Sequence, residues 1–248
     1  MNTEPMIKLH LYFATDNDRA VILRHGPSGL ARLILWHRDT DRFEDGQWLK
    51  ARVYPDCCDL SPDGQHFLFF ALDARWGSAA KGAYSALSRP PYWTALSLFP
   101  CGDTWRRGGL FIDNQHYLVD GDPDIIGRDQ GLSRVFEGEI TKDCKTGLRL
   151  SSGARAPLDR AVTKRILVDP QPTHPREVYS RILRPRHAAL DAYDTLGGQL
   201  YRRHGLDLEL IRDFTDMTFE PIRAPYDHRP ESPDADQPAW HPLDGEGA

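Results

Sequence analysis

A turn between two apolar runs, within residues 59–72, constrains the fold more than any other stretch of the chain. Its centre is Ser61-Pro62-Asp63-Gly64, in which the proline presets φ, the aspartate can bond its own backbone and the glycine tolerates a positive φ. The run from His66 to Leu72 is aromatic and aliphatic, lacks helix-forming charges and has the length of a buried strand. The stretch therefore predicts two strands joined by a tight turn.

Similar apolar segments precede this turn. They are the expected strands of a first unit, of which the earliest alternates apolar and polar residues as a half-buried strand does: Ile7–Phe13, Ala20–Arg24, Ala31–Trp36 and Trp48–Tyr54. Asn17-Asp18 and the segment from His25 to Gly29 supply turn residues between them. The spacing predicts a compact four-stranded unit.

Two more units follow with the same rhythm. In the second, the expected strands are residues 59–61, 66–72 and 93–99, with a loop over 73–92 and a short outer edge at 104–106. In the third, residues 109–112 and 116–119 flank the polar turn Asp113-Asn114-Gln115, and weaker strands are expected at 134–140 and 147–150. Both units are predicted to be β-sheets.

Prolines break this rhythm over residues 155–195, where we expect an irregular insertion rather than one long helix. Short helices are expected at 177–183 and from Ala188 to Leu196, and a last unit of strands at 199–202, 206–211 and 217–220. Residues 226–248 are acidic and rich in proline, so we expect a disordered tail.

The units start near residues 6, 55, 108 and 160, and this period of roughly 50 is typical of a four-stranded propeller blade. The segment Asp59-Leu60-Ser61-Pro62-Asp63-Gly64 resembles the turn between the first two strands of WD40- and TolB-type β-propeller blades. Leu33-Ile34-Leu35-Trp36 resembles their third strand, with His37 in place of the usual Asp. Residues 61–105 also resemble an uncharacterised bacterial family. The resemblance implies an all-β, irregular propeller-like domain of about four units over residues 6–225, and it transfers no catalytic residue.

Composition indicates which cellular compartment and which type of genome to expect. The 248 residues contain no apolar run long enough to cross a membrane and no basic-then-apolar start, so we expect a cytoplasmic protein without membrane contact. The four cysteines are expected to be buried free thiols of a reducing compartment. Arginine outnumbers lysine 25 to 6, which favours a GC-rich bacterial genome.

Motifs for chemistry are sparse. Cys57, Cys58, Asp59 and His66 are close in sequence, but strand alternation would place the two thiols on opposite faces, so no metal site is expected. The chain lacks a Gly-x-Ser-x-Gly elbow and both common phosphate-binding fingerprints. We therefore expect no cofactor and no identified catalytic residue, and leave an enzymatic activity open.

Aromatic and arginine side chains are dense in the loops of the second unit. Such residues dominate the energetic centres of protein interfaces, although the rings could equally be core. The candidate binding residues are Trp76, Tyr84, Arg89, Tyr92, Trp105, Arg106 and Arg107.

The favoured function is a non-catalytic module that binds another protein, with an immunity or defence-associated system as one hypothesis for its setting. The competing hypothesis is a hydrolase with a central propeller pocket lined by His and Asp. A third is an anion or nucleic-acid binder using residues 155–203, which carry ten basic and five acidic side chains.

Overall fold

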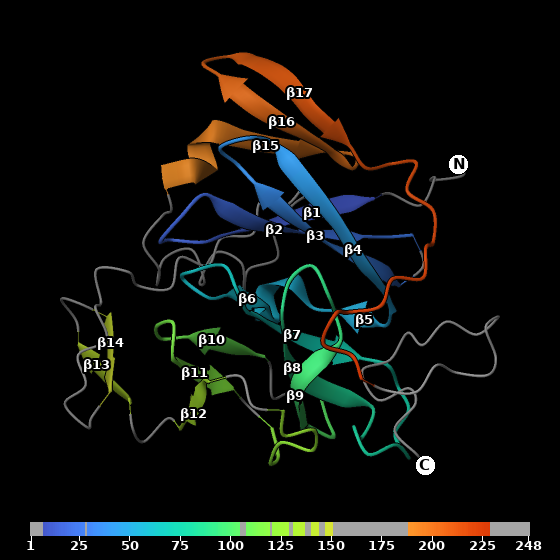
Figure 1. Cartoon of the computed structure of the whole chain (residues 1–248), viewed down its shortest axis with the longest axis vertical. Helices are drawn as coiled ribbons and strands as arrows, with labels where there is room; N and C mark the ends of the chain where they lie inside the picture. Colours follow the sequence, from blue (N-terminus) through green and yellow to red (C-terminus); the bar gives the residue numbers. More distant parts are fainter. Residues whose placement is uncertain are drawn as a thin grey trace.

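The computed structural model describes residues 7–27, 29–104, 108–119, 121–128, 131–136, 140–143, 147–150 and 188–228. Over these residues the chain is all-β, as predicted, with four sheets of three to five strands and no α-helix (Figure 1). No helix in this part of the chain is long and apolar enough to cross a membrane.

Sheet 1 is an antiparallel meander whose strands pair in chain order: β1 (Lys8–Phe13), β2 (Arg19–His25), β3 (Leu30–His37) and β4 (Arg42–Lys50). The first three strands match their predicted positions to within a residue or two. The fourth begins earlier than predicted, because Arg42 to Glu44 already pair with the end of β3. The first unit is therefore confirmed as a four-stranded sheet with a shifted last strand.

Sheet 2 repeats this meander with a broken first strand. Its elements are β5 (Arg52–Val53), η1 (Pro55–Cys57), β6 (Asp59–Leu60), β7 (Phe67–Leu72), β8 (Ala83–Ser88) and β9 (Ala95–Pro100). Both β5 and β6 pair with β7, at its two ends, so together they form one edge that η1 interrupts. The predicted turn at residues 61–64 joins β6 to β7, as expected.

The remaining strands form smaller sheets. Sheet 3 holds β10 (Gly109–Phe111), β11 (His116–Val119) and β12 (Ser133–Val135), the last parallel to β11. A separate hairpin joins β13 (Ile140–Asp143) to β14 (Gly147–Leu150). After the 3-10 turn η4 (Ala188–Ala192), sheet 4 is a meander of β15 (Tyr193–Leu196), β16 (Gln199–His204) and β17 (Asp207–Asp213).

Several predicted elements differ from the structure. Residues 83–88 were expected to be loop but form β8, because their small Ala and Ser side chains fit a central strand whose neighbours lie on both sides. Ala188–Leu196 is a 3-10 turn followed by a strand rather than a helix, residues 134–140 do not form one strand, and residues 217–220 form none. Of the predicted edge at 104–106 only Thr104 is described, and it is not in a strand. The helix at 177–183 and most of the insertion and of the tail lie outside the described residues.

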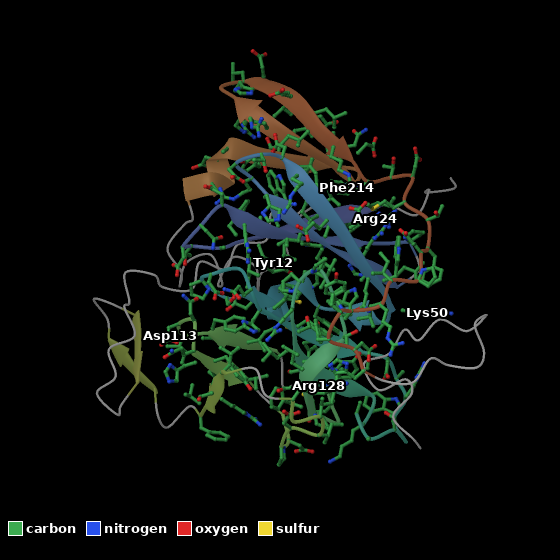
Figure 2. The ribbon with its side chains drawn as sticks, in the orientation of Figure 1. Tyr12, Arg24, Lys50, Asp113, Arg128 and Phe214 are labelled. Atoms are coloured by element: carbon green, nitrogen blue, oxygen red, sulfur yellow. The ribbon has the colours of Figure 1, made fainter. Side chains whose placement is uncertain are left out.

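The sheets pack face to face in the order 4, 1, 2, 3. Sheet 1 is buried on both faces: Leu11 and Phe13 pack toward sheet 4, whereas Tyr12 packs toward sheet 2 and donates a 2.7 Å hydrogen bond to the Pro55 carbonyl (Figure 2). A third apolar cluster, which includes Phe99 and Phe111, joins sheet 2 to sheet 3. The expectation of a half-buried strand at Ile7–Phe13 was wrong, because a sheet covers each of its faces.

The first strands of the four sheets lie side by side. β15 contacts β1, β1 contacts β6, and β6 contacts β10. The turns that follow β1, β6 and β10 meet at one end of the molecule, so these three strands run in the same direction. Sheet 4 departs from this pattern: Tyr193, at the start of β15, stacks on Phe13, and Gly198, beyond its end, adjoins Ile7. β15 therefore runs opposite to β1.

An extended segment, residues 214–228, leaves sheet 4 and runs along sheet 1 to sheet 2; we call it the C-terminal strap (Figure 1). The buried Arg24 guanidinium donates to the carbonyls of Phe214, Thr215 and Gly26 at 2.7, 3.2 and 2.7 Å (Figure 2). Arg32, which pairs with Arg24 across the sheet, forms an ion pair with Glu220. Buried polar groups are thus satisfied only when the strap is in place.

The Trp48 indole lies near both of these arginines. The guanidinium carbons of Arg24 and Arg32 are 5.2 and 5.3 Å from its ring centroid, within the range of a cation–π interaction. Burial and the neighbouring Arg32 charge lower the pKa of Arg24. The ring and the strap carbonyls therefore offset the cost of placing two cations side by side on one sheet face.

Gly64 in the first turn of sheet 2 tests the role of this turn. Its φ is +68°, and an added Cβ would lie 2.9 Å from the Arg19 Cβ, whereas Gly29 has φ +76° with open space around it. Gly64→Val should lower the free energy of unfolding by about 3 kcal/mol and Gly29→Val by about 1 to 2, since only the first adds a clash to the backbone strain. Urea denaturation measures both values, and equal losses would show that the close approach is unimportant.

His10 on β1 should make stability depend on pH. The side chain is 5% exposed, no described residue hydrogen-bonds its ring nitrogens, and burial, with help from His25 and Lys8, lowers its pKa to about 3. Below pH 6.5 the unfolded chain binds a proton at His10 that the folded chain refuses. Stability should therefore fall with falling pH, by at most about 1.4 kcal/mol per pH unit from this group.

His10→Phe removes this titrating group, so its unfolding free energy should fall less steeply between pH 6.5 and pH 5 than that of the unchanged protein. The matched control is His204→Phe, at a side chain that is 59% exposed. Denaturation curves at several pH values measure the slopes. If His10→Phe leaves the slope of unfolding free energy against pH unaltered, the His10 imidazole is not held neutral by burial.

Candidate functional site

The predicted aromatic and arginine surface is not one surface. Trp76, which is 55% exposed, lies in the loop between β7 and β8. Arg89 and Tyr92 lie in the loop between β8 and β9, at the other end of β8. Six strand residues separate the two loops by about 20 Å. The structure therefore places these candidates at opposite ends of sheet 2.

Tyr84 is not a surface residue. It is fully buried in the cluster between sheets 1 and 2, and its ring meets the Phe69 ring edge-on at 6.3 Å. Its place on a central strand that pairs on both sides explains this burial. Trp105, Arg106 and Arg107 lie outside the described residues.

Arg89 and Tyr92 contact the C-terminal strap. The Arg89 guanidinium carbon is 5.8 Å from the Tyr226 ring centroid, and the Tyr92 and Tyr226 rings meet edge-on. The Tyr226 hydroxyl accepts from the Arg89 backbone N–H and donates to the Thr94 carbonyl, and burial raises the pKa of Tyr226. These contacts anchor the strap to sheet 2.

The turns at the shared end of β1, β6 and β10 form a more coherent site. In each turn a side-chain oxygen accepts backbone N–H groups, as is typical of Asx turns. Asn17 accepts from Arg19, Asp63 accepts from Gln65, and Asp113 accepts from Gln115 and His116, over distances of 2.7 to 3.0 Å. Ser61 adds its hydroxyl, which donates to Asp63 and accepts from the N–H groups of residues 65 and 66. The local sequence thus builds each turn.

Hydrogen bonds also join the three turns to one another. The Pro62 carbonyl accepts from the backbone N–H groups of residues 15 and 16, and the Asn17 amide donates to the Asp63 carbonyl at 2.8 Å. Asn114 links the third turn to both others: its oxygen accepts from the Asp63 N–H and its nitrogen donates to the Asp16 carboxylate, each at 2.9 Å. The resulting closed ring of bonds fixes the turns relative to each other.

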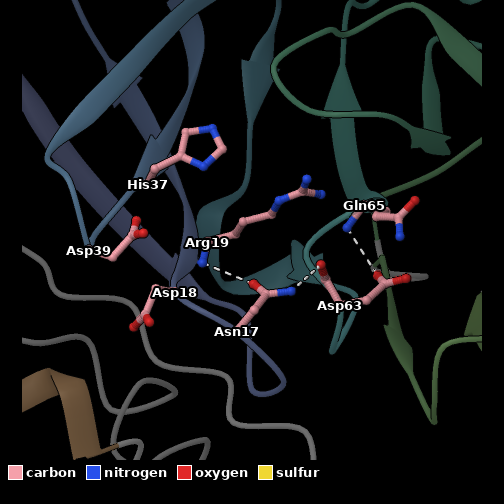
Figure 3. A pocket seen from close by; sticks show the side chains of 7 residues that line it. All are labelled: Asn17, Asp18, Arg19, His37, Asp39, Asp63 and Gln65. Carbon is pink, nitrogen blue, oxygen red and sulfur yellow. Dashed lines mark hydrogen bonds between the residues drawn. The ribbon is translucent and has the colours of Figure 1, made fainter.

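A hollow with a volume of about 470 Å³ lies beside these turns, between sheets 1 and 2 (Figure 3). The residues that line it are all of polar or charged type: Asn17, Asp18, Arg19, His37, Asp39, Asp63 and Gln65. Most of these side chains come from the β1–β2 and β6–β7 turns, and the others from the end of β3 and the turn after it. We call this hollow, together with the three linked turns, the turn surface.

The charges of the hollow differ in how far they are already paired. Asp18 forms a 3.1 Å ion pair with Arg38, and Asp63 is bonded within its own turn. His37 contacts Glu44 at 3.0 Å through Nε2. No hydrogen bond or ion pair joins the Arg19 guanidinium to another described residue, and the Asp39 carboxylate has only a 3.4 Å contact with the Thr40 hydroxyl. Arg19 and Asp39 are therefore the groups most available to a ligand.

This lining favours binding over covalent chemistry. It contains no hydroxyl or thiol that could act as a nucleophile, and its one histidine is turned toward Glu44. Aspartates do line the same hollow as His37. Within the described residues no cluster of His, Cys, Asp and Glu has the arrangement of a metal site.

The residues of the motif around Cys57 serve the fold. Cys57 packs with Phe70 and Cys101, whereas Cys58 packs in the cluster between sheets 1 and 2, so the two thiols do separate as expected. Asp59 is buried and accepts a 2.8 Å hydrogen bond from the Phe111 N–H, which ties sheet 2 to sheet 3. The three described cysteines are buried, as predicted, and Cys144 lies outside the described residues.

Burial also governs His66, which follows the turn. No described residue hydrogen-bonds its ring nitrogens, and burial lowers its pKa, with Asp63 opposing the effect and Arg89 adding to it. The imidazole is therefore neutral near pH 7, and it faces neither the hollow nor a metal cluster.

These turns were predicted from the sequence only as connections between strands, not as a site. The signal was available: a polar Asx turn follows the first strand in each of the first three units, at residues 16–18, 61–64 and 113–115. Asn17, Asp63 and Asn114 are spaced by 46 and 51 residues, close to the period of the units.

Comparison with known proteins gives no relative. No protein-family model matches the chain, and no curated protein or solved structure shows significant similarity to it.

Asn114 provides a test of the ring of bonds. Asn114→Ala removes two hydrogen bonds between turns and should lower the free energy of unfolding by about 1 to 2 kcal/mol. Gln115→Ala, at the exposed neighbouring side chain, is the matched control and should change it by less than about 0.5 kcal/mol. Chemical denaturation compares the two, and equal losses would show that the turns are not coupled through Asn114.

Proposed function

We propose that the chain is a non-catalytic module that binds another protein through the turn surface. The ring of bonds among three turns carries this proposal, because it holds a polar surface rigid on a β scaffold. Binding residues are commonly placed on loops that a rigid scaffold positions. Arg19 and Asp39 supply opposite charges on that surface, which suits a polar, charged segment of a partner.

We further propose that sheets 1, 2 and 3 are consecutive units of an irregular β-propeller-like fold. Three observations support this: two of them are meanders of the blade type, their first strands adjoin, and the turns after these strands gather at one end. Sheet 4, in which β15 runs opposite to β1, is the irregular member. A bacterial cytoplasmic system of immunity or defence is the setting we propose for this module.

Binding of nucleic acid through residues 155–203 receives less support. Of this segment only residues 188–203 are described, and both arginines there are paired with carboxylates, Arg202 with Asp41 at 2.7 Å and Arg203 with Asp194. Paired side chains offer less positive potential to a phosphate backbone. A hydrolase remains the alternative that the His and Asp residues of the hollow favour.

Charge reversal tests the proposed surface. The tagged full chain, purified from its native host, should retain a stoichiometric protein partner, and Arg19→Glu or Asp39→Lys should each weaken that retention about ten-fold or more. Asp216→Lys, at an exposed site on the strap, is the matched control. Thermal unfolding verifies that the variants are folded. A partner that both hollow variants retain, or no partner at all, would contradict the proposal.

A further inference from the structure

Sheet 4 and its β16–β17 turn expose four leucines that no described residue covers, on an outer face that also carries Arg203 and Asp194. Leu196, Leu206, Leu208 and Leu210 are 56, 99, 49 and 50% exposed, and they are half of the large apolar side chains that are exposed in the described part of the chain. In the register of the sheet, Leu208 lies opposite Arg203 and Leu210 opposite Tyr201. The inner face carries Leu200 and Tyr193, which are buried against sheet 1. Exposed apolar patches of this kind mark interaction sites.

The outermost strand of this sheet also has an open edge. β17 pairs with β16 on one side, and no other described strand pairs with it. Sheets usually protect such an edge with charged side chains, above all lysine, or with proline, bulges or very short strands. β17 spans seven residues and contains neither lysine nor proline, and its pairing is regular from Asp207 to Leu210, before a bulge at Ile211. β17 does carry the charged side chains Asp207, Glu209, Arg212 and Asp213, which would repel a strand of like charge but not a complementary one. Its free backbone groups can therefore take a further strand.

The charges of β17 indicate which strand would fit. Asp207 and Glu209 alternate with the leucines and point to the other face of the sheet. Glu209 is shared with His204 at 2.9 Å and Arg202 at 3.9 Å, whereas Asp207 has no ion pair with a described residue. A strand with basic residues on one face and apolar residues on the other would complement both rows.

A second copy of the chain would fit poorly. Antiparallel self-pairing centred on Leu210 sets Asp207 against Asp213, and self-pairing centred on Glu209 sets that carboxylate against its own copy. Like charges directly opposite each other destabilise a strand pair. The sequence of β17 therefore favours a different partner over a homodimer.

We propose that β17 is a docking edge for an extended segment of a partner protein, which adds a strand with apolar side chains over Leu208 and Leu210 and Lys or Arg opposite Asp207 and Glu209. This site lies on sheet 4 and is separate from the turn surface (Figure 1). It would add a second contact of different chemistry. Its test can therefore fail while the function proposed above holds, and the reverse.

Labelled peptides test this edge on the full chain by fluorescence anisotropy. A ten-residue peptide of alternating valine and lysine should bind at least about ten-fold more tightly than its valine and glutamate counterpart. Its affinity should also exceed that of a peptide of the same composition with the lysines in one block. Only alternation places the lysines on one face of the added strand and the valines on the other. N-methylation of alternate residues along the edge that would face β17 should abolish binding, since it removes the N–H donors of that edge.

Variants locate the binding on β17. Leu208→Lys and Leu210→Lys should each weaken the alternating peptide about ten-fold, because they place a cation on the apolar row. Phe219→Lys, at a side chain that is 41% exposed on the strap, is the matched control and should bind as the unchanged protein does. Because both leucine side chains are about half-exposed, the variants are expected to fold. Circular dichroism checks that they do.

Three outcomes would overturn the inference. Equal binding of the basic and acidic peptides, or binding that survives in both leucine variants, would mean that β17 does not select the peptide. A dimer in sedimentation that Leu208→Lys dissociates would make a second copy the occupant of the edge instead.

Discussion

The coverage of sheet 1 on both faces is the constraint on which the rest of the structure depends. Its strands carry apolar side chains in both directions, so neither face can remain in water without losing about 1.5 to 3 kcal/mol for each large side chain. Sheet 2 follows directly in the chain and covers one face. The other face is closed by sheet 4 and the strap, which come from the far end of the described chain. The position of sheet 1 between sheets 4 and 2 therefore follows from the double-sided pattern of β1 to β3.

The turns and the strands have different roles. Strands β1, β2, β3, β7, β8 and β9 are almost entirely buried, and their side chains pack rather than present chemistry to solvent. The turns after β1, β6 and β10 do present polar groups, and there short Asx-type bonds shape each loop and Asn114 couples one loop to two others. A polar surface built in this way is stiff for its size, which lowers the entropy lost when a partner binds.

Local sequence predicted the parts of the fold that depend on local chemistry. The turn at residues 61–64, the hairpin around Asp113 and the first three strands follow from turn residues and apolar runs, and the structure confirms them. β8 was not predicted because its Ala and Ser residues have no strand preference of their own. They adopt a strand because β7 and β9 pair with it on either side. Tyr84 was assigned to a surface for the same reason.

The candidate site was predictable only in fragments. Asn17, Asp63 and Asn114 were visible as turn residues, but their meeting depends on how three sheets stack, which no local pattern encodes. The double burial of Ile7–Phe13 likewise depends on sheet 4, more than 180 residues further along the chain.

The Arg24 contact with the Phe214 carbonyl joins residues 190 positions apart. A ribosome therefore releases sheets 1, 2 and 3 long before the segment that closes the second face of sheet 1. During that interval Leu11, Ile22 and Trp36 belong to an open apolar surface on a nascent chain. Contacts of such long sequence separation form slowly. Until they form, an exposed sheet face is prone to associate with other chains. A chaperone that shields sheet 1 until the strap arrives would act on this interval in the life of the protein.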